Sequence, residues 1–268
     1  MRTSSALFIL PLLACGATNP LPPLGSAGHQ LPFERIALTA VVPGATSFVG
    51  LTRDANHGNL HVLVPGVGIV ELAQDGTRQN TLAFGERGLV DHGFTDVVSL
   101  PDGSFVLSAL GEGLRYNPMT ATLQSHFCVE PNFNSEIILA NHAVTLDETR
   151  GRIIAAPTWH SVSDGSFVAG WHSQYRQDDG TPTESTEITA SGIVAKGVAF
   201  DSRNNQLLVV TGNKLHTFTV AGQVLGTRTL DGVLDASGVA VDADQRILYV
   251  LDDGKKELRA FALDGLGF

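Results

Sequence analysis

Apolar and polar positions alternate in short runs along most of the chain, and five segments repeat one design. Each segment has a short apolar strand, a turn rich in Asp, Asn or Gly, a second apolar strand and a third strand. The five segments begin at Gly50, Val97, Ala143, Gly197 and Gly238. No stretch of ten or more residues has an apolar stripe of helical period. The pattern therefore predicts an all-β chain built from repeated hairpins.

The repeat length identifies the architecture more closely. Aligned residues lie at Leu51, Val98, Val144, Val198 and Val239, which gives spacings of 47, 46, 54 and 41 residues. Spacings of this size are typical of four-stranded propeller blades. Weaker fourth strands are expected at Thr77–Ala83, Leu123–Cys128, Thr183–Thr189 and Val224–Leu230. We therefore predict a five-bladed β-propeller; a sixth blade and a β-sandwich are the alternatives.

The last repeat ends near Phe268 without a fourth strand, and a strand is left over near the start of the chain. The segment Phe33–Val42 is apolar and belongs to no other repeat. If it pairs with the third strand of the last repeat, Glu257–Phe261, the ring closes and no sheet edge stays open. We expect this closure.

The first residues resemble an export signal. Residues 1–14 hold one basic residue, Arg2, and a short apolar run, and Leu12-Leu13-Ala14-Cys15 resembles the lipobox of bacterial lipoproteins. That resemblance implies lipidation of Cys15, followed by a Gly/Pro-rich tether over 15–32 and the propeller over 33–268. Gly16 after the cysteine implies an outer-membrane address in the cell envelope. The alternative is an ordinary secretory signal with a chance cysteine.

Composition excludes several classes of function. The 268 residues carry a net charge of −10, which disfavours binding to a nucleic-acid backbone. Two cysteines cannot build a disulfide framework or a four-thiolate zinc site. Once Cys15 is acylated, Cys128 is a single thiol, which we expect to be buried among apolar neighbours.

Two repeats resemble a known family. The segment 238–265, GVAVDADQRILYVLDDGKKELRAFALDG, is similar to an NHL repeat, and the copy from Gly197 is similar except for Thr211 in place of the second-strand Asp. An anchor followed by five such units also resembles the SdiA-regulated type of bacterial envelope propeller. The resemblance implies the fold, whereas propellers host binding, scaffold and hydrolase functions alike.

Candidate functional residues lie where the inner strands begin, because a propeller commonly binds ligands at the mouth of its channel. We expect these side chains to converge near the axis: His92, Asp96, Asn141, His142 and Lys196. The imidazoles and the carboxylate are suited to hold a divalent metal such as calcium or to act as acid and base. Alternatively, they hydrogen-bond to one another and line the channel with water. A cation would be repelled by Lys196, and the sequence has no established catalytic motif.

A long loop is expected between the second and third strands of the third repeat, over Pro157–Ser166. It carries Trp159 and His160. An exposed tryptophan on such a loop is a good anchor for a protein or sugar partner. The alternative is that Trp159 packs over the neighbouring blade.

Taken together, the sequence predicts a lipid-anchored envelope β-propeller that binds a protein or another envelope partner, without a cofactor. The alternative function is a metal-dependent hydrolase or lactonase that uses His92, Asp96 and His142. A third hypothesis is a sensor of a sugar or another small ligand at the channel mouth.

Overall fold

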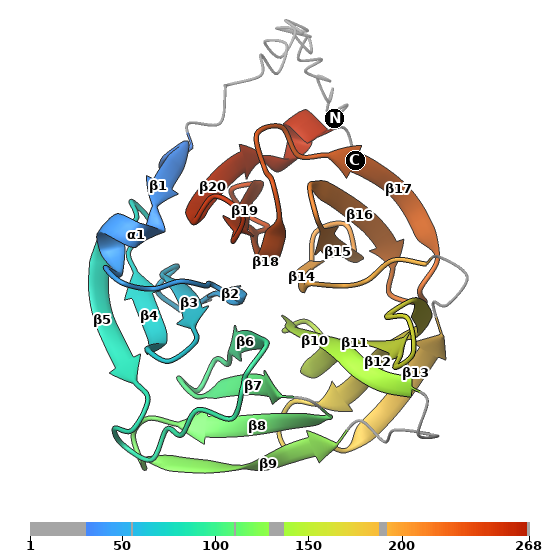
Figure 1. The fold of residues 1–268 in the computed structure, drawn as a ribbon, viewed down its shortest axis with the longest axis horizontal. Coiled ribbons are helices and arrows are strands. Elements are labelled where there is room, and N and C mark those ends of the chain that lie inside the picture. The colour runs from blue at the N-terminus through green and yellow to red at the C-terminus, as the bar shows by residue number, and fades with distance from the viewer. Residues whose placement is uncertain (1–30, 55, 110, 129–136, 188–191, 267–268) are drawn as a thin grey trace, which may run out of the picture.

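The computed structural model describes residues 31–54, 56–109, 111–128, 137–187 and 192–266. They form five antiparallel four-stranded sheets arranged in a ring, which confirms the five-bladed propeller (Figure 1). The predicted signal segment, Cys15 and most of the tether lie outside these residues. In the described part of the chain, no helix has the length and apolar character needed to cross a membrane.

The strands follow the expected order within each blade. Blade 1 holds β2 (Gly50–Arg53), β3 (Leu60–Val64), β4 (Gly68–Leu72) and β5 (Arg78–Ala83). Blade 2 holds β6 (Asp96–Ser99), β7 (Phe105–Ala109), β8 (Glu112–Asn117) and β9 (Thr122–Cys128). Blade 3 holds β10 (Ile137–Asp147), β11 (Arg152–Ser161), β12 (Phe167–Arg176) and β13 (Pro182–Glu187). Blade 4 holds β14 (Gly197–Asp201), β15 (Gln206–Thr211), β16 (Lys214–Thr219) and β17 (Val224–Thr229).

Blade 5 combines both ends of the described chain. Its sheet order is β1-β20-β19-β18, from β18 (Ala236–Asp242), β19 (Ile247–Asp252), β20 (Glu257–Ala262) and β1 (Arg35–Ala37). In β1, Ile36 pairs with Leu258 of β20. The predicted closure is therefore confirmed, and a short 3-10 helix, η2 (Leu263–Leu266), follows β20.

The closing strand is shorter than the sequence predicts. Only three residues are strand, and the chain then forms a helical turn, α1 (Leu38–Val41). Leu38 and Val42 are four residues apart, and both are buried in the apolar cluster between blades 1 and 5. The expected strand over Phe33–Val42 is thus wrong in its second half, because this turn buries both side chains and leads the chain toward β2.

The inner strands β2, β6, β10, β14 and β18 surround the axis (Figure 1). Their approach is so close that three of them need glycine. A Cβ on Gly197 would lie 2.7 Å from the Cα of Gly238, and one on Gly238 would lie 2.8 Å from the nitrogen of Leu51. A Cβ on Gly50 would lie 2.8 Å from the Cα of Asp96. The glycine that opens these repeats therefore allows neighbouring inner strands to approach one another this closely around the axis.

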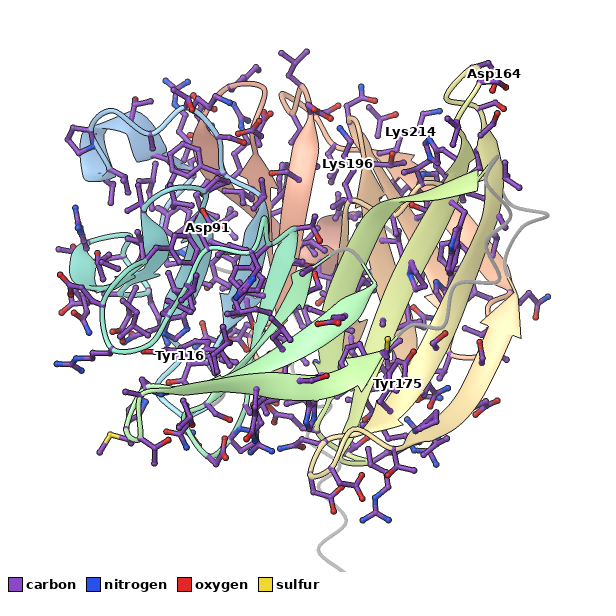
Figure 2. All side chains as sticks on the ribbon, turned by 60° about the horizontal axis from the view of Figure 1, so that its bottom comes forward. Asp91, Tyr116, Asp164, Tyr175, Lys196 and Lys214 are labelled. Carbon is purple, nitrogen blue, oxygen red and sulfur yellow. The ribbon has the colours of Figure 1, made fainter. Side chains whose placement is uncertain are left out.

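Blade 3 differs from the others. Its strands β10, β11 and β12 have 11, 10 and 10 residues, so Pro157–Ser161 is strand and not the predicted loop. These residues continue β11 because β10 begins before the expected repeat, and Leu139 pairs with Trp159 across a bulge. The hairpin between β11 and β12, with Asp164 labelled at its tip, therefore stands out at one face of the ring (Figure 2).

Candidate functional site

One face of the ring gathers the loops that precede the inner strands and the loops that join second to third strands. We call the axial opening on this face the loop mouth. It has a volume of about 360 Å³. The lining residues are Phe48, Val49, Thr95, His160, Val194, Lys196, Asp235, Ser237 and Asp253. This is the face where the sequence predicts the site, and Figure 2 labels Lys196 there.

Two ion pairs mark the rim of the loop mouth. Lys196 Nζ lies 2.7 and 2.9 Å from the two carboxylate oxygens of Asp235, and both side chains are close to 40% exposed. Lys256 Nζ lies 2.8 Å from Asp253 Oδ1, which also accepts the backbone N–H of Phe48 at 2.7 Å. The rim thus presents paired charges. The aromatic ring of Phe48, which also lines the mouth, has no exposed surface.

The NHL-like repeat explains how Asp235 reaches this position. The second-strand aspartate of that repeat, Asp252, is fully buried. Its carboxylate accepts the backbone N–H groups of Leu234 at 2.9 Å and Asp235 at 3.0 Å. This holds the loop before β18, and the side chain of Asp235 meets Lys196. In blade 4, Thr211 replaces that aspartate.

Asp96 lies deeper, among the inner strands. It is 1% exposed, and its carboxyl accepts the N–H of Val97 at 2.9 Å and of Val144 at 3.0 Å, with a further hydrogen bond from Leu51. Burial raises the pKa of the Asp96 carboxyl well above its ordinary value, and these backbone hydrogen bonds act in the opposite direction. Asp96 therefore ties three blades together at the axis.

The remaining candidates are not all at the loop mouth. His160 lines it, and its Nε2 is buried without a hydrogen-bond partner. His92 is exposed and lines a separate pocket of about 410 Å³ beside blade 2, with its ring 5.8 Å from that of Phe94. Asn141 and His142 lie in β10, and their side chains are outside the described part of the structure. The structure thus brings His160 and Lys196 together, and places His92 elsewhere.

Trp159 is buried, with 7% of its surface exposed, in an apolar cluster that includes Tyr175 and Val144. This position favours packing over partner contact. The loop face instead carries two exposed aliphatic side chains, Leu234 and Val162, at 61% and 53% exposure. Cys128 is exposed rather than buried, because the outer strand β9 has few neighbours on its outside.

The carboxylates of the loop mouth do not fit a divalent cation. Asp235 is engaged through both oxygens by an ammonium group, and Asp253 Oδ1 by an ammonium group and a backbone N–H. Calcium sites need six to eight oxygen ligands, several of them free carboxylate oxygens. Among the described residues, no group of three or more His, Cys, Asp or Glu side chains is placed to hold a metal. Asp235, which the sequence analysis missed, is therefore the partner of a lysine, and so is Asp253, whose pairing with a nearby lysine the sequence predicts.

Sequence comparisons find no match: no protein-family model and no curated protein matches the chain. Solved structures do match. In a nidogen/laminin complex, one chain superposes with a TM-score of 0.54 at 16% identity, covering 82% of this chain and 77% of that one. A gluconolactonase from Xanthomonas campestris gives 0.50 at 14% identity, covering 80% and 71%. A candidate gluconolactonase gives 0.51 at 16% identity, covering 80% and 73%. At such identities the likeness concerns the fold alone, so what these structures show is that the chain is a β-propeller.

Proposed function

We propose that this chain is a lipid-anchored β-propeller of the cell envelope that binds a protein partner through its loop face. The observation that carries the proposal is the combination of exposed aliphatic side chains and paired charges on one face. Leu234 and Val162 stand on the same face as the half-exposed Lys196–Asp235 pair. Protein interfaces commonly combine an apolar centre with a polar rim.

The rigidity of the ring supports this role. The loops that carry Leu234 and Asp235 are fixed by the buried Asp252 carboxylate, so little conformational entropy is lost when a partner binds. Blade 3 adds a wall on one side, because its second and third strands rise to the hairpin that holds Val162. A partner would therefore meet a preformed surface with one raised edge.

Photo-crosslinking tests the binding role. A photoreactive residue at Leu234 or Val162 should give one discrete adduct in intact cells, and Leu234→Asp should abolish the adduct formed from position 162. Met119 is the matched control, since it is 89% exposed in the turn between β8 and β9, away from the loop face. Adducts of equal intensity from all three positions, or none from the loop face, would refute the proposal.

The anchor has its own test, because the chain holds two cysteines. Labelling with an alkyne fatty acid should mark the wild type and Cys128→Ser, and should fail for Cys15→Ser, which should also leave the membrane fraction. Labelling that survives Cys15→Ser would show that this part of the proposal is wrong. Binding by the loop face is judged separately, by crosslinking.

The metal-dependent hydrolase stays the second hypothesis, and two of the structural neighbours are a gluconolactonase and a candidate gluconolactonase. The carboxylates of the loop mouth are engaged by lysines, so they support a metal-dependent hydrolase less than they support the binding of a protein partner. Added calcium or zinc should leave the melting temperature unchanged if the mouth holds no metal, since a ligand of the folded state raises that temperature. A metal-dependent increase lost in Asp253→Asn would instead favour the hydrolase.

A further inference from the structure

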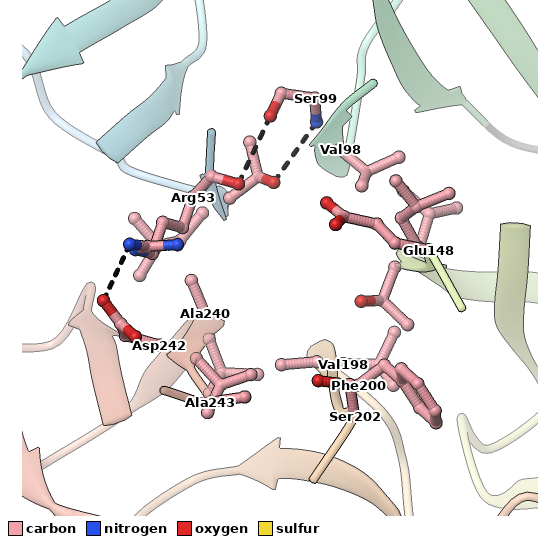
Figure 3. Close-up of a pocket in the computed structure, with 18 of the residues that line it drawn as sticks. Arg53, Val98, Ser99, Glu148, Val198, Phe200, Ser202, Ala240, Asp242 and Ala243 are labelled. Atoms are coloured by element: carbon pink, nitrogen blue, oxygen red, sulfur yellow. Dashed lines mark hydrogen bonds and ion pairs between the residues drawn. The ribbon is translucent and has the colours of Figure 1, made fainter. Parts of the chain in front are cut away.

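The opposite end of the axis holds a second cavity, which the proposed function does not use. It opens between the turns that join first and second strands, and we call it the hairpin mouth. Its volume is about 220 Å³ (Figure 3). That is smaller than the roughly 300–1,000 Å³ of pockets for drug-sized ligands, so its occupant must be small.

The floor of the hairpin mouth is aliphatic. It takes one residue at the same position of each inner strand: Leu51, Val98, Val144, Val198 and Val239. Each of these side chains is at most 4% exposed. Five buried aliphatic side chains favour an occupant with a hydrocarbon part over one that is polar on all sides.

Two walls of the hairpin mouth bear charged groups with unused hydrogen-bonding capacity. On one wall, Arg53 Nη2 lies 2.7 Å from Asp242 Oδ2, whereas its Nη1 and Nε have no hydrogen-bond partner among the described residues. On the facing wall, the carboxyl of Glu148 points toward the middle of the cavity and has no partner in the described structure (Figure 3). The cavity therefore offers donors on one side and an acceptor on the other.

The charges of the lining residues do not balance. Arg53 is matched by Asp242, which leaves Glu148 and Asp244 without a basic partner in the described part of the chain. Partial burial raises the pKa of Glu148, an effect that Arg53 opposes and Asp54 reinforces. A bound cation would relieve this excess of negative charge, whereas a bound anion would increase it.

We propose that the hairpin mouth binds a small aliphatic amino alcohol. Its ammonium group donates to the Glu148 carboxylate, its hydroxyl oxygen accepts from Arg53, and its hydrocarbon part covers the floor made by Leu51, Val98, Val144, Val198 and Val239. Ser202 and Thr145 also line the cavity.

Amino acids and simple alkylamines are chemically related to amino alcohols, but each fits the lining of the hairpin mouth less well. An amino acid has an ammonium group as well, but its carboxylate would face Asp242 beside Arg53. A simple alkylamine would leave the free N–H groups of Arg53 without an acceptor, and an unpaired polar group that loses water costs binding energy. A neutral oxygen suits a guanidinium group whose charge is already matched by Asp242.

Calorimetric titration of the full chain with leucinol, isopentylamine and leucine tests the assignment. Leucinol should bind with a dissociation constant of about 1 mM, as befits a ligand of few atoms. Isopentylamine should bind at least about tenfold more weakly because it lacks the hydroxyl group, and leucine should do so because its carboxylate would face Asp242. No heat from leucinol, or equal affinities for the three compounds, would overturn the proposal.

Two variants place the ligand in the cavity. Glu148→Gln should weaken leucinol binding by about tenfold or more, because it removes a charge-assisted hydrogen bond. Ser202→Leu should block the opening. Neither side chain has a hydrogen-bond partner in the described structure, so both variants should melt as the wild type does. Glu86→Gln, which changes an exposed carboxylate that does not line the cavity, is the control and should bind normally. Unchanged binding by Glu148→Gln would contradict the assignment.

Discussion

A buried arginine joins the last two blades, and replacing it measures how much the seams between blades contribute to stability. Arg246 precedes β19, and its side chain is 4% exposed. Its Nη1 lies 2.8 Å from Asp201 Oδ2 of blade 4, which is 2% exposed, and its Nε lies 2.8 Å from Asp264 Oδ1 in η2. One side chain therefore links blade 4, blade 5 and the end of the described chain.

The expected cost of Arg246→Met follows from what the change leaves behind. Removing one partner of a buried ion pair costs about 3–5 kcal/mol, because the other charge stays buried without compensation. Asp201 keeps hydrogen bonds from the Arg203 backbone N–H and from Asn204 Nδ2, both at 3.1 Å. Methionine also keeps much of the packing of the arginine stem. We therefore expect the lower end, about 3 kcal/mol, and a melting temperature about 6–12 °C lower.

Denaturant unfolding of wild type and variants provides the measurement. Asp264→Asn is the control, since Asp264 is 56% exposed, and a pair with an exposed partner contributes about 0–1 kcal/mol. The double variant Asp201→Asn/Arg246→Met should be more stable than Arg246→Met alone, because no buried charge is left unpaired. If Arg246→Met costs no more than Asp264→Asn, the buried pair does not hold the seam and the reasoning fails.

Three further predictions concern other parts of the ring. Burial lowers the pKa of His172 to about 4 from 6.5, so as the pH falls the unfolded chain takes up this proton before the folded chain does. The free energy of unfolding should therefore fall by about 3 kcal/mol between pH 6.5 and 4. In His172→Leu, the denaturant midpoint should depend less on pH over this range. Gly238→Ala would place a Cβ 2.8 Å from the Leu51 nitrogen and should cost about 1–3 kcal/mol, measured by thermal unfolding. The N–H of Leu38 donates to Lys256 O at 2.8 Å, beside the closing strand. Ile36→Asp should loosen this strand, so hydrogen exchange should accelerate at the N–H of Leu38 before it accelerates in blade 3.

The sequence predicts the ring because the repeat places chemically similar residues at equal positions. The aligned positions from Leu51 to Val239 are the buried floor of the hairpin mouth in all five blades. Aspartates that end inner strands also behave as turn formers: Asp242 Oδ1 accepts the N–H of Gln245 at 2.9 Å, and Asp201 Oδ1 that of Arg203 at 3.1 Å. Such local rules operate within a few residues, so they can be inferred from one chain.

The candidate site is harder to predict, because it lies on segments outside the repeat. The place of Lys196 before β14 identifies it as a candidate, but its partner Asp235 lies 39 residues away in a loop with no repeated pattern. His92 precedes β6 as Lys196 precedes β14, yet it lines a different pocket, since the long loop before β6 leads it outward along blade 2. Equal positions in a repeat thus fix the strands, whereas the paths of the loops decide which side chains meet.

Ring closure explains why the loop mouth and the hairpin mouth both have contacts across the boundary between blades 1 and 5. Phe48 and Asp253 are 205 residues apart, and the Oγ of Ser237 donates to the carbonyl of Phe48 at 2.6 Å across a separation of 189 residues. At the other end of the axis, Arg53 meets Asp242 across the same boundary between blades 1 and 5. These contacts all cross the boundary between blade 1 and blade 5, the blade that β1 completes, so a change that weakens the closing strand should disturb both mouths before it disturbs the boundary between blades 2 and 3. Once a sequence predicts closure, partners for residues of the first blade should therefore be sought in the last blade.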